Sequence, residues 1–193
     1  GCCGKGVELV ELSSYASPEA AFDALVSGDP VELEELIIQH PQVSSVYPNS
    51  INTVRTVSIT KDGVPHIICT YFRIGNGGRH VDNFNSGGMV VPVDEKTGTV
   101  LDKAIDKTKA LYATHPMTGT PIKGFRFPDW DKAIQLVHGA AREIPQMAYV
   151  GWDIAFTPNG PCLVEGNNFP GHDIYQLPEH TPDKIGMMDK FRV

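Results

Sequence analysis

The sequence predicts an α+β fold with mostly antiparallel sheets and a few covering helices. Two tight-turn sequences, Lys61-Asp62-Gly63 and Pro158-Asn159-Gly160, each separate two runs rich in β-branched and aromatic residues, which is typical of β-hairpins. Between them, Pro128 to Glu143 carries apolar side chains at helical spacing. Hairpins give antiparallel strand pairs, and an amphipathic helix buries its apolar stripe against another element. A sheet covered by helices satisfies both patterns.

The N-terminal residues alternate between strand-like and helical patterns. Val7 to Leu12 alternates in polarity as a strand does. Ser17 and Pro18 are a capping residue and a first-turn proline, so a helix is expected from there to about Ser27. Residues 31–39 are acidic, then apolar, then polar, and are again strand-like.

The rest of the chain is predicted to contain two hairpins before the amphipathic helix and one after it. The first two pair residues 52–60 with 65–74, and residues 89–94 with 98–101. A loop rich in Gly and Asn separates these hairpins, whereas residues 103–127 show no clear pattern. The last hairpin joins 149–156 to 162–165, and a short helix is expected from about Pro182.

The composition is that of an ordinary globular protein, with 41% hydrophobic and 20% charged residues among 193. The net charge of −7 argues against nucleic acid or an anionic membrane surface as the main partner. Because the sequence has no run of 18 apolar residues and no signal-peptide pattern, no membrane span is predicted and a cytoplasmic location is expected. The chain begins in a glycine-rich turn without an initiator Met, so we expect a fragment that lacks an N-terminal part.

The strongest functional pattern is formed by Asp153, Glu165 and Asn167 in the last hairpin. If this hairpin is symmetric about Asn159, Asp153 lies directly opposite Glu165, and Asn167 shares the face of Glu165. Carboxylates on opposed strand positions, about 5 Å apart, repel each other. A hard cation relieves this repulsion, and Mg²⁺ with an attached polyphosphate is the usual solution. The pattern therefore predicts a magnesium–nucleotide site.

The alternative is that both carboxylates are ordinary solvated residues on an exposed hairpin. Ala155 and Leu163 are predicted to share the carboxylate face, which argues against an open surface there. The turn-rich run 167–171 could also present backbone groups to a ligand. Together these observations favour the site.

Two N-terminal motifs suit a nucleotide. Gly4-Lys5-Gly6 could fold over phosphates with Lys5 as a point charge, although a tight turn with a surface Lys gives the same pattern. This motif opens a strand rather than a helix, which argues against Walker A and Rossmann loops. The run from Val31 to His40 suits an adenine hinge, where a carboxylate accepts from the exocyclic amine. The alternative for that run is a strand whose glutamates face water.

Two further motifs could contact an anion. Arg55 lies in a predicted strand among β-branched residues, where an arginine either pairs with an acid or faces an anion. Asp82 and Asn83 precede the pair Gly87-Gly88, whose glycines allow close approach of the backbone to a ligand, and Arg79 lies just upstream. A flexible loop is the alternative for the second motif.

The joint order of these motifs resembles the ATP-grasp superfamily, specifically the sugar-transfer-associated ATP-grasp proteins related to α-L-glutamate ligases. The residues that carry the resemblance span nearly the whole chain: Gly4 to Val7, Glu34 to Pro41, Asn52 to Arg55, Asp82-Asn83 with Gly87-Gly88, His115-Pro116 with Gly119, Gly151 to Asp153, and Glu165 to Asn167 with Pro170-Gly171. Their joint order is far more specific than any one motif.

The resemblance implies two ATP-grasp lobes, with residues 1–40 ending the small lobe and residues 41–193 forming the C-terminal lobe. The phosphates of ATP would be covered by Gly4, Lys5 and Gly6. Adenine would be bound by four hinge residues, Glu34, Glu35, Leu36 and Ile37, and the ribose by Gln39 or His40. One or two Mg²⁺ ions, which Mn²⁺ could replace, would be held by Asp153, Glu165 and Asn167.

The resemblance also implies a carboxylate–amine ligase. The substrate carboxylate would react with ATP to give an acylphosphate, which an amine or sugar-linked acceptor then attacks. Arg55 and Arg79 would neutralise charge on the transferred phosphoryl group, and Asn83 falls on an N-x3-G-G element of the family. The product would modify a sugar or a cell-surface polysaccharide precursor. A phosphotransferase and a non-catalytic nucleotide- or sugar-binding module are the alternatives.

The sequence departs from the family pattern at three places. Gly151 stands where several peptide-forming members have an arginine two residues before the metal-binding Asp. Val81 stands where glutathione-synthetase-like members have an arginine before the loop Asn, although Arg79 could substitute. An N-terminal strand with a second phosphate-contacting Lys is absent. Nucleotide binding is therefore the firmer expectation, and the substrates are open.

Overall fold

The structure is a computed structural model that describes residues 10–26, 34–78 and 80–193. The chain divides into two compact units, Gly1–Leu36 and Ile37–Val193. Four residues predicted to act in a nucleotide site lie outside the described residues: Gly4, Lys5, Gly6 and Arg79. The assignment of residues 1–40 and 41–193 to two lobes stays a prediction.

In the first unit, helix α1 (Pro18–Leu25) begins where the sequence predicts it. The Ser17 side chain accepts a hydrogen bond from the backbone N–H of Ala20 at 3.1 Å, and Pro18 occupies the first helical position. The strand expected over residues 7–12 is wrong in its described part, because Leu12 begins a short 3₁₀ helix that ends at Ser14. The strand expected over residues 31–39 is also wrong where it is described, since residues 34–39 belong to no strand.

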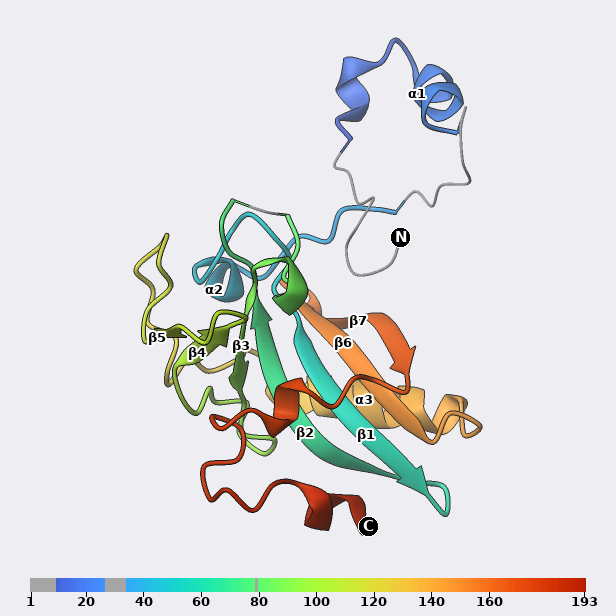
Figure 1. The fold of residues 1–193 in the computed structure, drawn as a ribbon. Coiled ribbons are helices and arrows are strands. Elements are labelled where there is room, and N and C mark those ends of the chain that lie inside the picture. The colour runs from blue at the N-terminus through green and yellow to red at the C-terminus, as the bar shows by residue number, and fades with distance from the viewer. Residues whose placement is uncertain (1–9, 27–33, 79) are drawn as a thin grey trace. The chain divides into compact units, whose positions relative to one another are not determined.

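The second unit is built on one seven-stranded antiparallel sheet (Figure 1). Along the sheet the strands are β5 (Leu111–Tyr112), β4 (Ala104–Asp106), β3 (Met89–Pro92), β2 (Val64–Ile74), β1 (Val54–Lys61), β6 (Tyr149–Thr157) and β7 (Gly160–Asn168). Two α-helices accompany it, α2 (Pro41–Ser44) and α3 (Trp130–Glu143). The predicted α+β class with antiparallel strands is confirmed.

The first predicted hairpin is present as β1 and β2, joined by a two-residue turn. Both turn residues have positive φ, 52° at Asp62 and 76° at Gly63, as a type I′ turn requires. The second predicted hairpin is confirmed only in part: Val93 and Val100 form an isolated bridge, and residues 98–101 form no strand. Instead β3 pairs with β2 and with β4.

The other differences from the predicted elements concern short segments. Residues 103–127, which show no sequence pattern, supply the two small strands β4 and β5. A 3₁₀ helix at Met188–Phe191 replaces the helix expected from about Pro182. Helix α2 and the 3₁₀ helices at Phe84–Ser86 and Ile174–Gln176 were not expected from the sequence.

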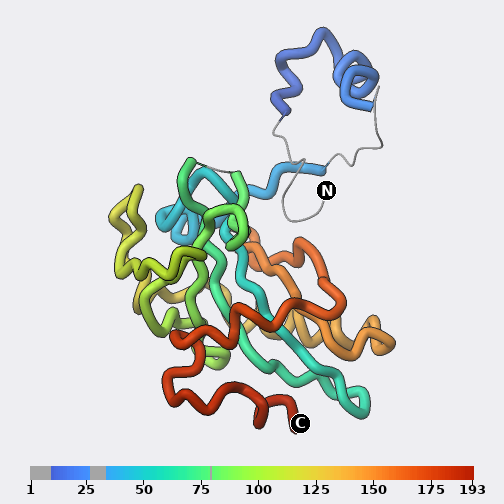
Figure 2. Tube along the Cα trace, in the orientation of Figure 1, coloured from blue at the N-terminus to red at the C-terminus, as the bar shows by residue number. Residues whose placement is uncertain are grey.

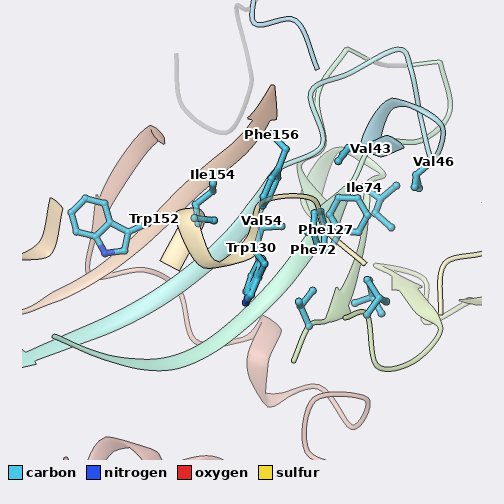
Figure 3. Close-up of a cluster of buried hydrophobic side chains, with 14 of the residues drawn as sticks. Val43, Val46, Val54, Phe72, Ile74, Phe127, Trp130, Trp152, Ile154 and Phe156 are labelled. Carbon is cyan, nitrogen blue, oxygen red and sulfur yellow. The ribbon is translucent and has the colours of Figure 1, made fainter. Parts of the chain in front are cut away.

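One face of the sheet packs against helix α3. The predicted apolar stripe of α3 is buried at Trp130, Ala133, Val137 and Ala141. These side chains join a cluster with strand residues that include Trp152, Ile154 and Phe156 (Figure 3). Alternation along β6 places these three residues on the same face, because their numbers differ by two.

The opposite face is covered at one end by the C-terminal segment. Ile174 and Tyr175 are buried there against Val57, Cys69 and other strand residues. Figure 2 shows this segment, coloured red, crossing the sheet toward the C-terminus. The odd-numbered residues of β1 and β6 point to this face, so Arg55 and Asp153 lie on it, beyond the apolar cluster.

Candidate functional site

Three neighbouring strands bring together the main predicted residues. Arg55 on β1 is the register partner of Asp153 on β6, and Asp153 is the register partner of Glu165 on β7. Register partners share a face of the sheet, so the three charged side chains form a row across β1, β6 and β7. The predicted opposition of Asp153 and Glu165 is confirmed.

The hairpin reaches this register through a β-bulge rather than by symmetry about Asn159. Thr157 pairs with Gly160 and Ile154 pairs with Leu163, and the register then shifts by one residue before Asp153 pairs with Glu165. The shift leaves Val164 as the extra residue on β7. One expectation is thereby corrected: Leu163 does not share the carboxylate face but packs into the α3-side cluster with its partner Ile154.

Asp153 is a buried carboxylate held by two arginines. Arg55 donates through Nε to Oδ1 and through Nη2 to Oδ2, the second bond being 2.7 Å long. Arg73 donates through Nη1 to Oδ2, also at 2.7 Å. Burial alone would raise the pKa of Asp153, but these hydrogen bonds and charges outweigh it and hold the pKa below its usual range. Asp153 is therefore ionised at neutral pH.

Arg73 is the site residue that sequence reasoning missed. It lies on β2, two residues after Tyr71, and its guanidinium links Asp153 to the loop that follows β2. Its Nη2 donates to the side-chain oxygen of Asn83 and lies 2.9 Å from Oδ1 of Asp82. An arginine inside the strand run Phe72-Arg73-Ile74 was a usable signal, because a strand arginine between apolar residues needs a partner.

The loop carrying Asp82 and Asn83 is fastened to the start of β1. Oδ2 of Asp82 accepts from the backbone N–H and from the hydroxyl of Thr53. Burial raises the pKa of Asp82 despite the lowering effect of Arg73 and these bonds. Gly88 closes the loop, and a Cβ there would lie 2.4 Å from the carbonyl oxygen of Asp82, so only glycine fits. Asn83 is thus held beside the row of charges.

Glu165 and Asn167 form the open end of the row. The side chain of Glu165 is 56% exposed, and its Oε1 lies 3.9 Å from Nη2 of Arg55. Asn167 donates through Nδ2 to Oε1 of Glu165 at 2.9 Å, a bond that does not use the Asn167 amide oxygen. Both side chains lie on the face predicted from the alternation of β7.

The donor chemistry of these residues fits a magnesium ion, which prefers oxygen ligands. Among the residues that the structure describes, no group of three or more His, Cys, Asp or Glu side chains could hold a metal. The predicted set has two carboxylates and one amide, so further oxygens would have to come from phosphate or water. Asp153 is ionised and Glu165 is exposed beside it, so these two carboxylates together favour a cation.

Gly151 creates the space in which Arg55 is packed. A Cβ at Gly151 would lie 2.7 Å from Cβ of Pro170 and 3.0 Å from Cδ of Arg55. Pro170 is buried, and the residue before it, Phe169, has a positive φ of 51° and is 76% exposed. The place of a side chain two residues before Asp153 is therefore filled by Pro170, from the segment after β7.

The predicted adenine and ribose residues lie along an extended segment. Glu34, Glu35 and Leu36 are exposed, Ile37 is half-buried, and Leu36 and Ile37 straddle the boundary between the two units. Nδ1 of His40 accepts from the backbone N–H of Gln42 at 3.2 Å and so caps α2. Gln39 bonds to Asn52 through its Oε1, at 2.6 Å to the backbone nitrogen, which makes Gln39 part of the framework.

A second histidine of the sequence pattern has a structural position. His115 is completely buried and stacks on Tyr47 with ring centroids 5.0 Å apart. Its Nδ1 accepts from the backbone N–H of Met117, so its Nε2 is the atom that donates to the carbonyl of Gly75 at 2.9 Å. Gly75 N–H in turn donates to Asn52 at 2.9 Å. This chain of bonds ties the segment before β1 to the end of β2.

A comparison with protein families shows which family the chain belongs to. A family profile described as sugar-transfer associated ATP-grasp matches residues 19–182, well over half of the chain. The chain belongs to this ATP-grasp family. The match includes every described residue of the charged row and of the loop at Asp82. No curated protein matches the chain significantly.

Membership of the ATP-grasp family supports ATP binding and a ligase-type or sugar-modifying role. Such domains bind ATP and typically Mg²⁺. Within the described part of this ATP-grasp chain, no helix has the length and apolar character needed to cross a membrane.

Proposed function

We propose that the chain is an ATP- and Mg²⁺-dependent carboxylate–amine ligase that acts through an acylphosphate. The observation that carries this proposal is the row of Arg55, Asp153 and Glu165, which sets two carboxylates and a guanidinium on adjacent strands of an ATP-grasp chain. Charge of both signs at one place suits a metal-bound polyphosphate, in which the cation meets carboxylates and the phosphate oxygens meet arginine.

Asp153, Glu165 and Asn167 would hold the magnesium ion. When bound, Mg²⁺ would neutralise charge on the phosphate oxygens and help to align the transferred group. The half-buried Arg73 would keep Asp153 and Asn83 in place through its bonds to both. Gly4, Lys5 and Gly6 would cover the phosphates, the segment from Glu34 to Ile37 would receive adenine, and His40 would lie near the ribose. We expect these residues to bind ATP in the cytoplasm.

The reaction would proceed in two steps that this site could promote by charge and position. An oxygen of the substrate carboxylate would form a bond to the γ-phosphorus of ATP as the bond from that phosphorus to ADP breaks. The amine would then form a bond to the acyl carbon, lose a proton to water, and release inorganic phosphate. Arg55 and Arg79 would stabilise the charge on the phosphoryl oxygens, with Asn83 beside them. The acceptor would be an amine or sugar-linked molecule, in cell-surface polysaccharide or sugar modification.

One observation favours a second function, a non-catalytic nucleotide- or sugar-binding module. Pro170 fills the place beside Gly151 where several peptide-forming relatives would have an arginine. The cation that stabilises developing negative charge there is replaced by an apolar ring. Arg55 or Arg73 could supply the missing positive charge only if its guanidinium leaves Asp153.

Calorimetric binding of a non-hydrolysable ATP analogue, with and without Mg²⁺, tests the metal–nucleotide site. We expect Mg²⁺-dependent binding that the double variant Asp153→Asn/Glu165→Gln weakens by at least about a hundredfold, because two charged ligands contribute about 1.5 kcal/mol or more each. Asp131→Asn/Glu143→Gln removes the same charge from exposed positions on α3 and should bind like the wild type. Equal binding by both double variants would refute the site.

A turnover assay separates the ligase from its alternatives. Hydroxylamine traps an acylphosphate as a stable hydroxamate, so a ligase supplied with its carboxylate, ATP and hydroxylamine should give hydroxamate and inorganic phosphate in equal amounts. A phosphotransferase would leave phosphate on a hydroxyl acceptor and give no hydroxamate. Nucleotide binding without either product, across carboxylate and sugar-linked substrates, would support the non-catalytic module.

A further inference from the structure

Arg55 contacts both of the carboxylates that are proposed to bind metal. Its guanidinium is hydrogen-bonded to both oxygens of Asp153, and its Nη2 lies 3.9 Å from Oε1 of Glu165. Arg73 also bonds to Asp153, but its Nη2 is directed to Asp82 and Asn83. Arg55 is thus the arginine that faces both carboxylates of the proposed metal site.

We propose that Arg55 is an internal counter-ion that holds the place of the divalent cation, and that metal binding displaces it from Asp153 and Glu165. This inference rests on the proposed function, and it adds a regulation to the same site. The site alternates between a state closed by Arg55 and a metal-loaded state in which the guanidinium of Arg55 binds the phosphate of the nucleotide.

Asp153 keeps a cationic partner throughout the exchange. Because Arg73 keeps its bonds to Asp82, Asn83 and Asp153, the buried Asp153 is never left without a cation, which would be strongly destabilising.

The packing of Arg55 allows its charged end to move while its stem stays fixed. The stem lies next to Pro170 above Gly151, since a Cβ at Gly151 would approach both. Among the described residues, the guanidinium is held by the charged side chains of Asp153 and Glu165. Long arginine side chains can change their terminal contacts without moving the stem. A metal that takes Asp153 and Glu165 therefore releases the guanidinium without disturbing the hairpin.

The test measures Mn²⁺ binding by electron paramagnetic resonance on the full chain without nucleotide. If the closed state holds more than about nine-tenths of the molecules, Arg55→Met should bind Mn²⁺ at least about tenfold more tightly than the wild type. Arg73→Met is the matched control, since it removes the same charge from Asp153 but leaves the contacts of Arg55 with both carboxylates. We expect its gain in affinity to stay below about threefold.

A second measurement, of nucleotide affinity, should change in the opposite direction to the affinity for Mn²⁺. With the ATP analogue and Mg²⁺ present, Arg55→Met should bind the nucleotide more weakly than the wild type, because the released guanidinium is then missing from the phosphate. Arg55→Lys keeps a cation without the two-pronged bond to Asp153, and its Mn²⁺ affinity should lie between those of the wild type and Arg55→Met. If Arg55→Met does not fold, as judged by its circular dichroism, the comparison of Arg55→Lys with the wild type decides.

The outcomes separate this inference from the proposed function. The counter-ion role is overturned if the wild type binds Mn²⁺ as tightly as Arg55→Met does, or if both methionine variants gain the same affinity for Mn²⁺. Either result leaves the metal site intact. No Mn²⁺ binding by any variant would overturn the metal site itself and the counter-ion role with it. Tighter Mn²⁺ binding confined to Arg55→Met, with weaker nucleotide binding, is the supporting result.

Discussion

At the scale of single residues, His180 is a buried titratable side chain whose ring lacks polar partners. It is 7% exposed, and neither ring nitrogen has a hydrogen-bond partner. Its ring packs edge-on against Tyr71 with centroids 5.8 Å apart. Burial lowers the pKa of His180 to about 4, because the charged form would lose its hydration without gaining a partner. The neutral imidazole is the form that the fold accepts.

This residue makes the stability of the chain depend on pH. Because the folded pKa is below the unfolded value of about 6.5, the unfolded chain binds the proton first, and stability falls as the pH drops from about 6.5 toward about 4. The contribution approaches about 1.4 kcal/mol per pH unit within that window. His180→Leu should flatten this slope in urea unfolding measured from pH 7 to pH 4.5. His172→Gln, at an exposed position, should keep the wild-type slope, and an unchanged slope in His180→Leu would contradict the assignment.

Sequence reasoning found part of the charged row, and the reason lies in the range of the contacts. Asp153 and Glu165 belong to one hairpin, so turn chemistry places them near each other, but their direct opposition depends on the β-bulge at Val164, which the two-residue period does not predict. Arg55 could be placed on a strand but not beside Asp153, because the pairing of β1 with β6 joins residues about a hundred positions apart. Arg73 was missed because its partners belong to a loop and to a third strand, which local patterns do not bring together.

At the scale of elements, short-range turns were predictable and partner choice was not. The Asp62-Gly63 turn fixes β1 and β2, since positive φ at both positions is the signature of the hairpin. Residues 34–39 were expected to belong to a strand, yet they form no strand among the described residues, because a strand-like composition does not specify a neighbouring strand. The strands β4 and β5 are three and two residues long, which is too short for any period to be visible.

The packing of the β6–β7 hairpin on the following segment gives a prediction for two glycines. Gly151→Ala should destabilise the chain by about 1–3 kcal/mol, because its Cβ would overlap Pro170 and Arg55 in a buried place. Gly139→Ala, the same substitution on helix α3, meets nothing within 4 Å and should stabilise the chain by about 0.5–1 kcal/mol. Thermal unfolding of the two variants should therefore shift in opposite directions.

The Gly151 result also bears on the site, because Arg55 lies against the same contact. A displaced Pro170 changes the packing of the Arg55 stem, so Gly151→Ala should weaken Mg²⁺-dependent nucleotide binding as well as the fold. Gly139→Ala should leave nucleotide binding at the wild-type level. If Gly151→Ala were as stable as the wild type, the packing of Pro170 over Gly151 would not describe the molecule in solution.

At the scale of the whole molecule, the two units differ in how much core they contain. Both apolar clusters consist of residues between Val43 and Val193, one on each face of the seven-stranded sheet. Within the described part of Gly1–Leu36, Ala21 is the buried hydrophobic residue. The unit Ile37–Val193 is about 150 residues long, a size at which a domain buries enough surface to fold by itself.

A chain shortened to residues 37–193 should therefore unfold cooperatively in urea, and it should keep the charged row. Because it lacks the predicted phosphate loop and most of the adenine hinge, its affinity for the ATP analogue should fall by at least about tenfold, the loss expected for one or more removed charge-assisted contacts. Its affinity for Mn²⁺ alone should stay at the wild-type level, since all three proposed metal ligands remain. Calorimetry on the short and full chains compares both quantities. Equal nucleotide affinity in the two chains would show that residues 1–36 contribute nothing to the site, and the assignment of the phosphate loop and the hinge would then be wrong.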